Sequence, residues 1–417
     1  MAYLLSQYPA ISHTFFLREV LAMRERGFLI ETASVNSIHP PAGGFPQEEM
    51  GEAARTFYIK ETPKPAILKT LLKTLLGRPS VVTRGLSAAL RLRPWDLPGT
   101  AYALFYLVEA ILLGDWMQRK GCGHLHVHFG GSVATVGMLT SIAWEIPYSL
   151  TIHGPEEFYD VGLSFLEQKL RQAKFATCIS HFCRSQLYKI APVADWGKFE
   201  VCRLGVQTDV FSPPPEAGRE TLHIVSVGRL HPAKGQMILL GAFRELLGRG
   251  MNIRLSIIGD GDGRRTLEEF IAASGMVGSV TLHGALSHPA TRAVLGTADL
   301  FVLPSFAEGV PVALMEAMSM QVACISTFVA GIPELIEPGR QGLLVPPSSQ
   351  AELTEAMASL ITDPSRREAY ATAGREKVLS SYDLSTNIGR LIAVFEQNGV
   401  TGGDPPATSA ASVRPNS

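Results

Sequence analysis

Short apolar runs alternate with helix-like stretches along most of the chain, and this alternation restricts the fold more than any other feature of the sequence. Strands that alternate with helices predict parallel sheets with helices on both faces. The runs fall into two groups, so we expect two α/β domains. The strand-like runs span residues 125–129, 148–152, 175–179, 223–227, 254–258, 280–282 and 300–303.

A proline-rich segment separates the two groups of strands. Pro213, Pro214 and Pro215 are consecutive, and proline both removes a backbone donor and favours extended chain. We therefore expect a linker at residues 209–219, between an N-terminal domain (1–208) and a C-terminal domain (220–380). The final residues, 400–417, are rich in Gly, Pro, Ala and Ser with little apolar bulk, which predicts a disordered tail.

Charge and cysteine usage restrict the class of protein. The 417 residues carry a net charge of −1, whereas a protein that binds nucleic acid by counterion release needs a basic surplus. The five cysteines are widely spaced and form no Cys-x-x-Cys motif, which favours a reducing compartment. The N-terminus has no secretory signal pattern, so we expect a cytoplasmic protein.

Two glutamates frame the stretch that points most strongly to a binding site. Residues 301–304 suit a buried strand, Glu308 follows in a loop, and Pro311 suits the first position of a helix. Glu316 then lies in the second helical turn, about 7 Å along the helix axis. The helix N-terminus between the carboxylates favours an anion. An acid at each end and an anion site between them fit a nucleotide sugar, while two solvated glutamates remain the alternative.

A second loop supplies cations for a phosphate. A strand ends at Gly228, and Arg229 and Lys234 follow before a helix that begins near Gln236. Arginine offers a planar fork and lysine a mobile point charge, so the pair suits a diphosphate. The loop also follows the carboxyl end of a strand, where open α/β sheets bind ligands.

Two other patterns resemble metal sites. Asp260 and Asp262 lie in a glycine-rich turn, and the glycines favour a role in close backbone approach. Two carboxylates alone are too few ligands to indicate a magnesium site. His124, His126 and His128 alternate on one strand face without a nearby carboxylate or cysteine cluster in the sequence. We expect these histidines to serve packing and hydrogen bonding. The prediction is therefore no metal and no cofactor.

A basic, leucine-rich segment spans residues 60–93. It carries eight Lys or Arg residues against a single acid, Glu61. Such a pattern is typical of a helix on a membrane surface, although the same leucines would serve a domain core, and both interpretations stay open. The apolar run 102–114, interrupted by Glu109, is shorter than the roughly 20 residues that cross a membrane, so we expect a core helix there.

Together these motifs resemble the retaining GT-B glycosyltransferases of family four. The resemblance covers most of residues 120–395. Residues 8–19 and 126–158 are more similar to bacterial exopolysaccharide transferases of the colanic-acid type, although Ser12-His13-Thr14 replaces the family's frequent glycine-rich first loop. The family motifs are carried by Gly228-Arg229-Leu230, Lys234-Gly235, residues 259–264, His153-Gly154, residues 308–316, residues 331–336 and residues 342–345.

The resemblance implies two Rossmann-like domains that face each other across a cleft. It also implies a helix at residues 381–399 that crosses back onto the first domain, with Tyr382-Asp383 at the crossing point. The second domain would hold a nucleotide-diphosphate sugar through Gly228, Arg229, Lys234, Gly259, Gly261, Gly309, Val310 and Glu316. The implied catalytic residues are Glu308, His153, Arg229 and Lys234.

Each of these residues has an implied role. Glu316 would bind the ribose hydroxyls, and Glu308 with the Gly309 backbone would bind the transferred sugar. Arg229 with Lys234 would hold the pyrophosphate. His153 is by itself a lone histidine at a Gly-Pro turn, which is more often structural than catalytic; the resemblance implies that it reaches across to the donor sugar.

The implied activity is metal-independent transfer of a hexose, with retention, to a lipid-linked or polysaccharide acceptor in exopolysaccharide synthesis. The resemblance implies a mechanism without a protein nucleophile, in which the enzyme accelerates transfer by positioning the reactants and stabilising charge. The resemblance implies an acceptor at the inner membrane face. The cysteine usage and N-terminus predict a cytoplasmic protein, the charge predicts no nucleic-acid partner, and a peripheral membrane contact through residues 60–93 is a separate hypothesis from the composition of that segment. The alternatives are a nucleotide-sugar epimerase or phosphorylase on the same fold, and a non-catalytic GT-B scaffold protein.

Overall fold

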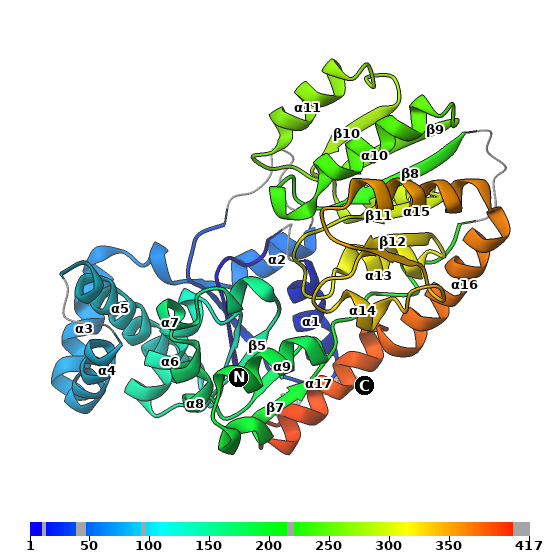
Figure 1. Cartoon of the computed structure of the whole chain (residues 1–417). Helices are drawn as coiled ribbons and strands as arrows, with labels where there is room; N and C mark the ends of the chain where they lie inside the picture. The colour runs from blue at the N-terminus through cyan, green and yellow to red at the C-terminus, as the bar shows by residue number, and fades with distance from the viewer. Residues whose placement is uncertain (11–13, 39–46, 93–96, 215–220, 403–417) are drawn as a thin grey trace, which may run out of the picture.

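The computed structural model describes residues 1–10, 14–38, 47–92, 97–214 and 221–402. Two parallel sheets form the centres of two halves (Figure 1). Part of the linker prediction (residues 215–219), most of the tail prediction (403–417), Ser12-His13 and the last residue of the basic segment, Arg93, lie outside the described residues.

The first sheet has seven strands in the order β3-β2-β1-β4-β5-β6-β7. Its central strands are short and buried on both faces, as expected where helices cover a parallel sheet. The strand order reverses between β1 and β4, which makes this point the topological switch of the sheet. The strands are β1 Ala2–Leu5, β2 Glu31–Ser34, β3 Phe57–Tyr58, β4 Leu125–His128, β5 Tyr148–Ile152, β6 Ala176–Cys178 and β7 Phe199–Val201.

The second sheet has six strands in the order β10-β9-β8-β11-β12-β13, and it reverses between β8 and β11. Neighbouring strands of both sheets pair in parallel. The strands are β8 Leu222–Val227, β9 Ile253–Ile258, β10 Val280–Gly284, β11 Leu300–Leu303, β12 Ala323–Thr327 and β13 Leu343–Val345.

Helices connect the strands and cover the sheets. Those of the first half are α1 Thr14–Glu25, α2 Gln47–Arg55, α3 Lys64–Gly77, α4 Pro79–Arg91, α5 Leu97–Lys120, α6 Ser132–Trp144, α7 Val161–Ser164, α8 Leu166–Gln172 and α9 His181–Ile190. Those that follow are α10 Gln236–Gly248, α11 Arg264–Ala273, α12 His288–Leu295, α13 Val312–Ser319, α14 Ile332–Leu335, α15 Gln350–Thr362, α16 Pro364–Ser381 and α17 Leu384–Gln397.

The last two helices connect the halves. Figure 1 shows α16 along the second half and α17 beside the first. The backbone of Val206 pairs with the chain at 382–384: its N–H donates to the Tyr382 carbonyl at 2.9 Å, and the Leu384 N–H donates to the Val206 carbonyl at 3.0 Å. Ile388, Leu391 and Phe395 of α17 then join a buried cluster with side chains of β1 and α1. The described part of the chain therefore ends on the half where it began.

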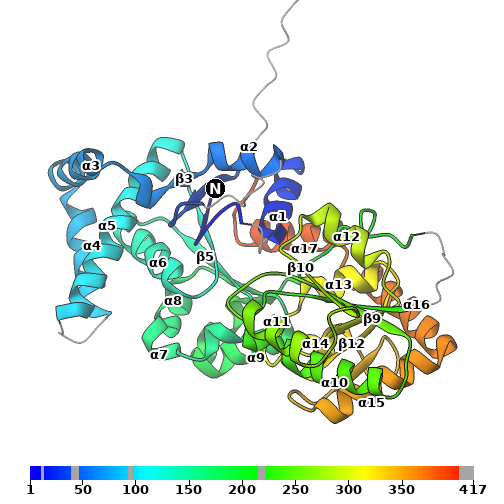
Figure 2. The same cartoon turned by 90° about the horizontal axis from the view of Figure 1, so that it is seen from above.

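Helices α3, α4 and α5 form a lobe at the edge of the first half (Figure 2). Among the described helices, α5 is long and apolar enough over Gly99–Lys120 to cross a membrane by length and composition, so the expectation of a shorter apolar segment there is wrong. However, 61 % of its most apolar window is buried within the protein, where α5 packs against α3, α4 and α6. This burial supports a core helix.

Candidate active site

Glu308 lies at the carboxyl edge of the second sheet and is held by two donors. Its Oε1 accepts hydrogen bonds from Lys234 Nζ at 2.6 Å and from Ser305 Oγ at 2.7 Å. Glu308 is buried, whereas a quarter of the Lys234 side chain remains exposed. The structure thus brings together an acid and a cation that lie 74 positions apart in the sequence.

The backbone fixes the two loops that carry this pair. Lys234 ends a short 3₁₀ turn after β8, and Gly235 follows with a φ of +67°. A side chain at Gly235 would overlap the Pro304 carbonyl, so only glycine fits where the two loops meet. The Phe306 N–H also donates to the Ala233 carbonyl at 2.7 Å.

Glu316 occupies the second turn of α13, as the sequence predicts. It is buried, and its Oε1 lies 3.1 Å from Nε2 of His288, the first residue of α12. The predicted helix start is wrong by one residue: Pro311 is the N-cap with extended backbone, and the helix begins at Val312. Buried Val310 packs in the apolar cluster beneath these loops.

The remaining cation of the loop, Arg229, is exposed on the surface between Gly228 and buried Leu230. The glycine turn after β9 lies directly beside it. A side chain at Gly259 would overlap the Gly228 carbonyl, and one at Gly261 would lie 2.6 Å from the Leu230 carbonyl. These two glycines therefore serve close backbone approach, as the sequence analysis expects.

The two halves touch where the loops after β5 and β11 meet. A side chain at Gly309 would overlap the His153 carbonyl, and the Gly309 carbonyl accepts a hydrogen bond from the Gly331 N–H at 3.0 Å. His153 is buried, and its Nε2 lies 3.0 Å from His128 Nδ1. The His153 ring thus contacts the interior of the first half, and its backbone faces the Glu308 loop.

Glu157 and Lys169 hold the loops of the first half, and the sequence analysis assigned neither a role. Glu157 Oε2 accepts from the N–H groups of His153 at 2.7 Å and Gly154 at 2.9 Å, and its Oε1 accepts from the Gly130 N–H. Lys169 Nζ donates to the carbonyls of Gly130 at 2.8 Å and Gly131 at 2.7 Å.

Burial moves the pKa values of this pair toward each other. Burial raises the pKa of Glu157 to about 7, while its backbone donors and Lys169 lower it. Burial likewise lowers the pKa of Lys169 to about 7, against the attraction of Glu157. The sequence does carry a signal for Glu157, because a glutamate three residues after the residue that precedes a helical turn commonly bonds the N–H groups at its start. Gly154 precedes such a turn here, and the Glu157 side chain bonds the N–H groups of Gly154 and His153.

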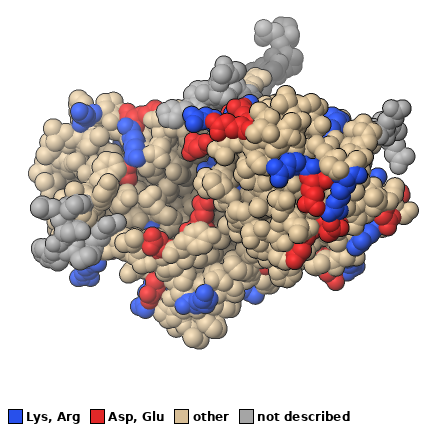
Figure 3. Space-filling view, turned by 45° about the horizontal axis from the view of Figure 1, so that its top comes forward, with Lys and Arg blue, Asp and Glu red and all other residues tan. Residues whose placement is uncertain are grey.

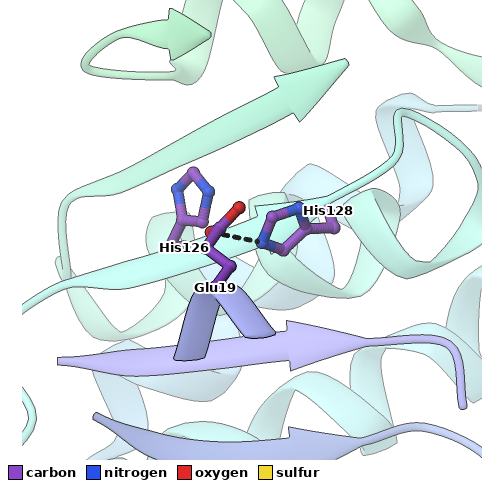
Figure 4. Close-up of side chains that lie close together, drawn as sticks. All are labelled: Glu19, His126 and His128. Carbon is purple, nitrogen blue, oxygen red and sulfur yellow. Dashed lines mark ion pairs between the residues drawn. The ribbon is translucent and has the colours of Figure 1, made fainter. Parts of the chain in front are cut away.

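A buried cluster beneath His153 corrects one expectation. The sequence shows no carboxylate near the histidines of β4, yet Glu19 of α1 lies beside them (Figure 4), with its Oε1 3.3 Å from His128 Nε2. Tyr3 OH donates to the same carboxylate at 3.0 Å. Glu19 lies 109 positions before His128, and only the pairing of β1 with β4 brings α1 over this strand.

His126 of β4 and His124, which precedes this strand, are bonded to hydroxyl groups of the neighbouring strand β5. His126 lies within 2.9 Å of Ser149 Oγ and Thr151 Oγ1 through its two ring nitrogens, and His124 Nε2 lies 2.8 Å from Ser149 Oγ. Burial lowers the pKa of His124 to about 3 and also lowers that of His126. Both histidines therefore fit the expected packing and hydrogen-bonding role. Asp260 and Asp262 are exposed in the glycine turn.

Glu334 of α14 connects the second half to the first. Its carboxylate accepts hydrogen bonds from the N–H groups of His181 at 3.0 Å and Phe182 at 2.8 Å, which open α9. A carboxylate at a helix N-terminus satisfies free donors and interacts favourably with the helix dipole. Arg203 lies 3.8 Å from the same carboxylate. This contact crosses from one half to the other beside the Gly309 loop.

The charged surface agrees with the near-neutral composition. In the face drawn in Figure 3, basic and acidic side chains are interspersed among uncharged surface, and a hollow separates the two halves. The described residues on this face form no broad basic field of the kind that binds a nucleic-acid backbone.

Comparison with known proteins identifies the second half. Residues 211–377 match the family model of the glycosyl transferases group 1. The putative colanic acid biosynthesis glycosyltransferase WcaL of Escherichia coli (strain K12) is 28 % identical over 391 residues, which cover 91 % of this chain and 95 % of that protein. The amylovoran biosynthesis glycosyltransferase AmsK of Erwinia amylovora is 26 % identical over 410 residues, which cover 94 % and 98 %.

Solved structures share the whole architecture. Sucrose-phosphate synthase from Thermosynechococcus elongatus superposes with a TM-score of 0.72 at 17 % identity, over 95 % of this chain and 98 % of that one. Anabaena Alr3699/HepE in complex with UDP and glucose gives 0.72 at 16 % identity, over 95 % and 99 %. The predicted GT-B fold and the predicted likeness to exopolysaccharide glycosyltransferases are confirmed.

Proposed function

We propose that this chain, a glycosyltransferase whose residues 211–377 form a group 1 glycosyl transferase domain, transfers a hexose from a nucleotide-diphosphate donor with retention and without a metal ion. The observation that carries the proposal is the pairing of Lys234 with Glu308 at the carboxyl edge of the second sheet, next to the first turn of α13. The family places sugar transfer in this fold, and these loops supply the groups that a sugar diphosphate requires.

The donor has three parts, the ribose, the pyrophosphate and the transferred sugar, and different residues of the loops bind each part. Glu316, buried and fixed by His288, accepts hydrogen bonds from the ribose hydroxyls. Arg229 and Lys234 neutralise the pyrophosphate, with the backbone of Gly228, Gly259 and Gly261 leaving room for it. HepE, which shares the fold, is described in complex with UDP and glucose, and this supports a nucleotide sugar as the donor.

Glu308 and His153 hold the transferred sugar from opposite halves. Glu308 and the Gly309 backbone contact its hydroxyls, and the Gly309 loop lies against the His153 backbone. As the diphosphate departs, the sugar gains oxocarbenium character and the acceptor hydroxyl attacks from the same face. Attack from the same face needs no protein nucleophile, and the departing phosphate oxygen takes the proton of the acceptor hydroxyl, so no protein base is needed. Lys234 and Arg229 stabilise the charge on the leaving group.

The lobe formed by α3 and α4 supports an acceptor at a membrane surface. Leu68, Leu72, Leu75 and Leu76 of α3 are exposed, the last by 81 %, while Thr74 is the buried residue of this helix. These leucines do not serve a domain core, and lysines at 64, 69 and 73 on the same helix are exposed with them. We propose a peripheral, cytoplasmic contact with anionic lipid through this face and a lipid-linked or polysaccharide acceptor.

Vesicle binding tests the membrane contact. We expect the protein to co-sediment with phosphatidylserine-containing vesicles at low salt and to be released as salt screens the basic residues. Replacement of Leu72 and Leu76 by serine is expected to weaken binding about tenfold or more. Replacement of the exposed leucines Leu163 and Leu379, outside this lobe, is the control. Equal binding of wild type and the Leu72/Leu76 variant would contradict the contact.

A thermal-shift panel of nucleoside diphosphates and their sugars tests the donor. A ligand that binds only the native state raises the Tm. At one hundred times its Kd, such a ligand adds about 2.7 kcal/mol to the free energy of unfolding. We expect one nucleotide series to raise Tm in wild type and to do so much less in Glu316→Gln. Release of nucleoside diphosphate with a glycosylated acceptor of unchanged anomeric configuration distinguishes transfer from epimerisation or phosphorolysis. A chain that binds none of the nucleotides would be a scaffold.

A further inference from the structure

A cavity of about 150 Å³ lies in the first half, apart from the donor loops. Asn36, which lines it, comes two residues after β2, and Ser132 is the first residue of α6, after β4. The cavity therefore opens at the carboxyl edge of the first sheet and beside the point where the strand order reverses between β1 and β4. Open α/β sheets bind their ligands at such positions.

Glu109 of α5 lines this cavity without a partner. Its side chain is 3 % exposed, and within the described part of the chain neither carboxyl oxygen has a hydrogen-bond partner. A buried polar group left unpaired costs free energy, and native proteins rarely retain one without a use. Burial raises the pKa of Glu109 to about 7, against the nearby cation Lys60, so near neutral pH the carboxyl group both donates and accepts hydrogen bonds.

The other groups of the cavity suit a neutral, hydroxyl-rich ligand. Lys60 Nζ donates to Asn36 Oδ1 at 2.7 Å and lies 5.7 Å from the centre of the Phe105 ring. The protonated Glu109 carboxyl group is neutral, and the Lys60 ammonium group is engaged by Asn36 Oδ1 and lies near the Phe105 ring. Tyr102 and Phe105 are 59 % and 48 % exposed beside the cavity. Aromatic faces with a few placed polar groups are typical of ligand sites.

We propose that this cavity binds one hexopyranose ring, the sugar unit of the acceptor, an assignment that rests on the proposed glycosyl transfer. A cavity of this volume holds a six-membered ring. The carboxyl group of Glu109 bonds the ring hydroxyls, and Tyr102 and Phe105 pack against the C–H face of the ring, whereas the Asn36 amide is held by Ser6 and Lys60. The carboxyl edge of the sheet also carries His153, after β5, so the bound ring lies on the edge that meets the donor loops.

Saturation-transfer NMR with simple glycosides tests the site directly. The probes are methyl α-glucopyranoside, methyl β-galactopyranoside and methyl α-mannopyranoside, each added to the full chain. We expect at least one probe to receive saturation from wild type and its signal to fall fivefold or more in both Tyr102→Ala and Glu109→Ala, since a glutamine at position 109 would still donate and accept hydrogen bonds. Leu104→Ala is the matched control, because Leu104 lies on the same helix, is 41 % exposed and does not line the cavity.

Nucleotide binding by the same proteins separates this proposal from the proposed function. Because the cavity belongs to the first half, Tyr102→Ala and Glu109→Ala are expected to bind nucleoside diphosphates as wild type does. Absence of glycoside binding in wild type, or equal signals in wild type and both variants, overturns the sugar site. Failure of every nucleoside diphosphate to bind wild type instead overturns the donor site, while glycoside signals that depend on Tyr102 and Glu109 would still support the cavity.

Discussion

Two glutamates in this molecule differ in how completely their carboxylates are paired. Glu308 has a lysine and a serine as donors, whereas Glu109 has no hydrogen-bond partner in the described part of the chain. The sequence predicts the first case, because a strand, a loop and a helix start follow one another around Glu308. The isolation of Glu109 results from the packing of α5 against α6 and the turn at Ile59–Glu61, and the sequence shows only one acid in an apolar run.

The Glu109 carboxyl group gives the stability of the protein a pH dependence. Its folded pKa of about 7 exceeds its ordinary value of 4.5, so the folded state binds more protons between these values and the free energy of unfolding falls as pH rises through this window. Allowing for solvent that reaches the cavity, the loss is about 2 kcal/mol. Urea unfolding of wild type and Glu109→Gln from pH 4.5 to 8 measures this loss. The free energy of unfolding of wild type, relative to that of Glu109→Gln, is expected to fall until about pH 7. A difference in unfolding free energy between the two proteins that stays constant over this pH range would contradict the raised pKa of Glu109.

Glu19 stabilises the cluster beneath His153. Replacement by alanine leaves the Tyr3 hydroxyl and the His128 ring without their carboxylate in a buried site. We expect Glu19→Ala to lower the free energy of unfolding by about 2–5 kcal/mol, since each unpaired buried group costs ~1–3 kcal/mol. Glu48→Ala breaks an exposed ion pair with Arg18 on the same half and is expected to cost less than about 1 kcal/mol. Equal losses, measured by urea unfolding, would show that the carboxylate is not required.

At the scale of elements, each predicted strand run falls on an observed strand, but the apolar strands β1, β12 and β13 were not among the predicted runs. The predicted ranges 148–152 and 300–303 coincide with β5 and β11. The sequence analysis did not identify β2, because its residues Glu31-Thr32-Ala33-Ser34 lack both alternation and an apolar run. Its last three residues are nonetheless buried, in a strand that lies between β1 and β3. The start of α13 shifted by one residue because Pro311 takes extended backbone as the N-cap.

Glu334 links two elements from different halves, and its removal is expected to loosen both. Without its carboxylate, the N–H groups of His181 and Phe182 lose their acceptors at the start of α9. We expect Glu334→Ala to accelerate amide exchange of residues 181–184 about fivefold or more, which corresponds to roughly 1 kcal/mol. Hydrogen exchange read by mass spectrometry measures this change.

The control for this prediction lies one turn away. Glu337 forms an exposed ion pair with Arg340, so Glu337→Ala should leave exchange at 181–184 unchanged. Exchange that is equally slow in Glu334→Ala and wild type would mean that the carboxylate does not hold the two halves together at this contact.

At the scale of the whole molecule, two sheets meet through loops at their carboxyl edges, and α17 returns to the first half (Figure 1). The sequence predicts part of each sheet from apolar runs: β4, β5 and β6 of the first, and β8 to β11 of the second. It does not predict the contacts between the halves, because the Gly309 to His153 approach and the Glu334 cap involve backbone atoms of residues more than 150 positions apart. Such contacts depend on the completed fold and leave no local pattern.

The central claim is that Lys234 and Glu308 act on a sugar diphosphate, and a transfer assay tests it most directly. Purified wild type is incubated with a nucleotide-sugar panel and membranes that carry the lipid-linked acceptor, and nucleoside diphosphate and glycosylated product are measured. Glu308→Gln and Lys234→Ala are compared with Lys198→Ala, which breaks an ion pair with Asp195 in the first half.

We expect both donor-site variants to keep a Tm close to that of wild type and to lose transfer by about 10²–10³-fold, the usual cost of removing one group that stabilises charge in the transition state. The Lys198→Ala control should transfer at the wild-type rate. Wild-type transfer rates in both Glu308→Gln and Lys234→Ala would contradict the account.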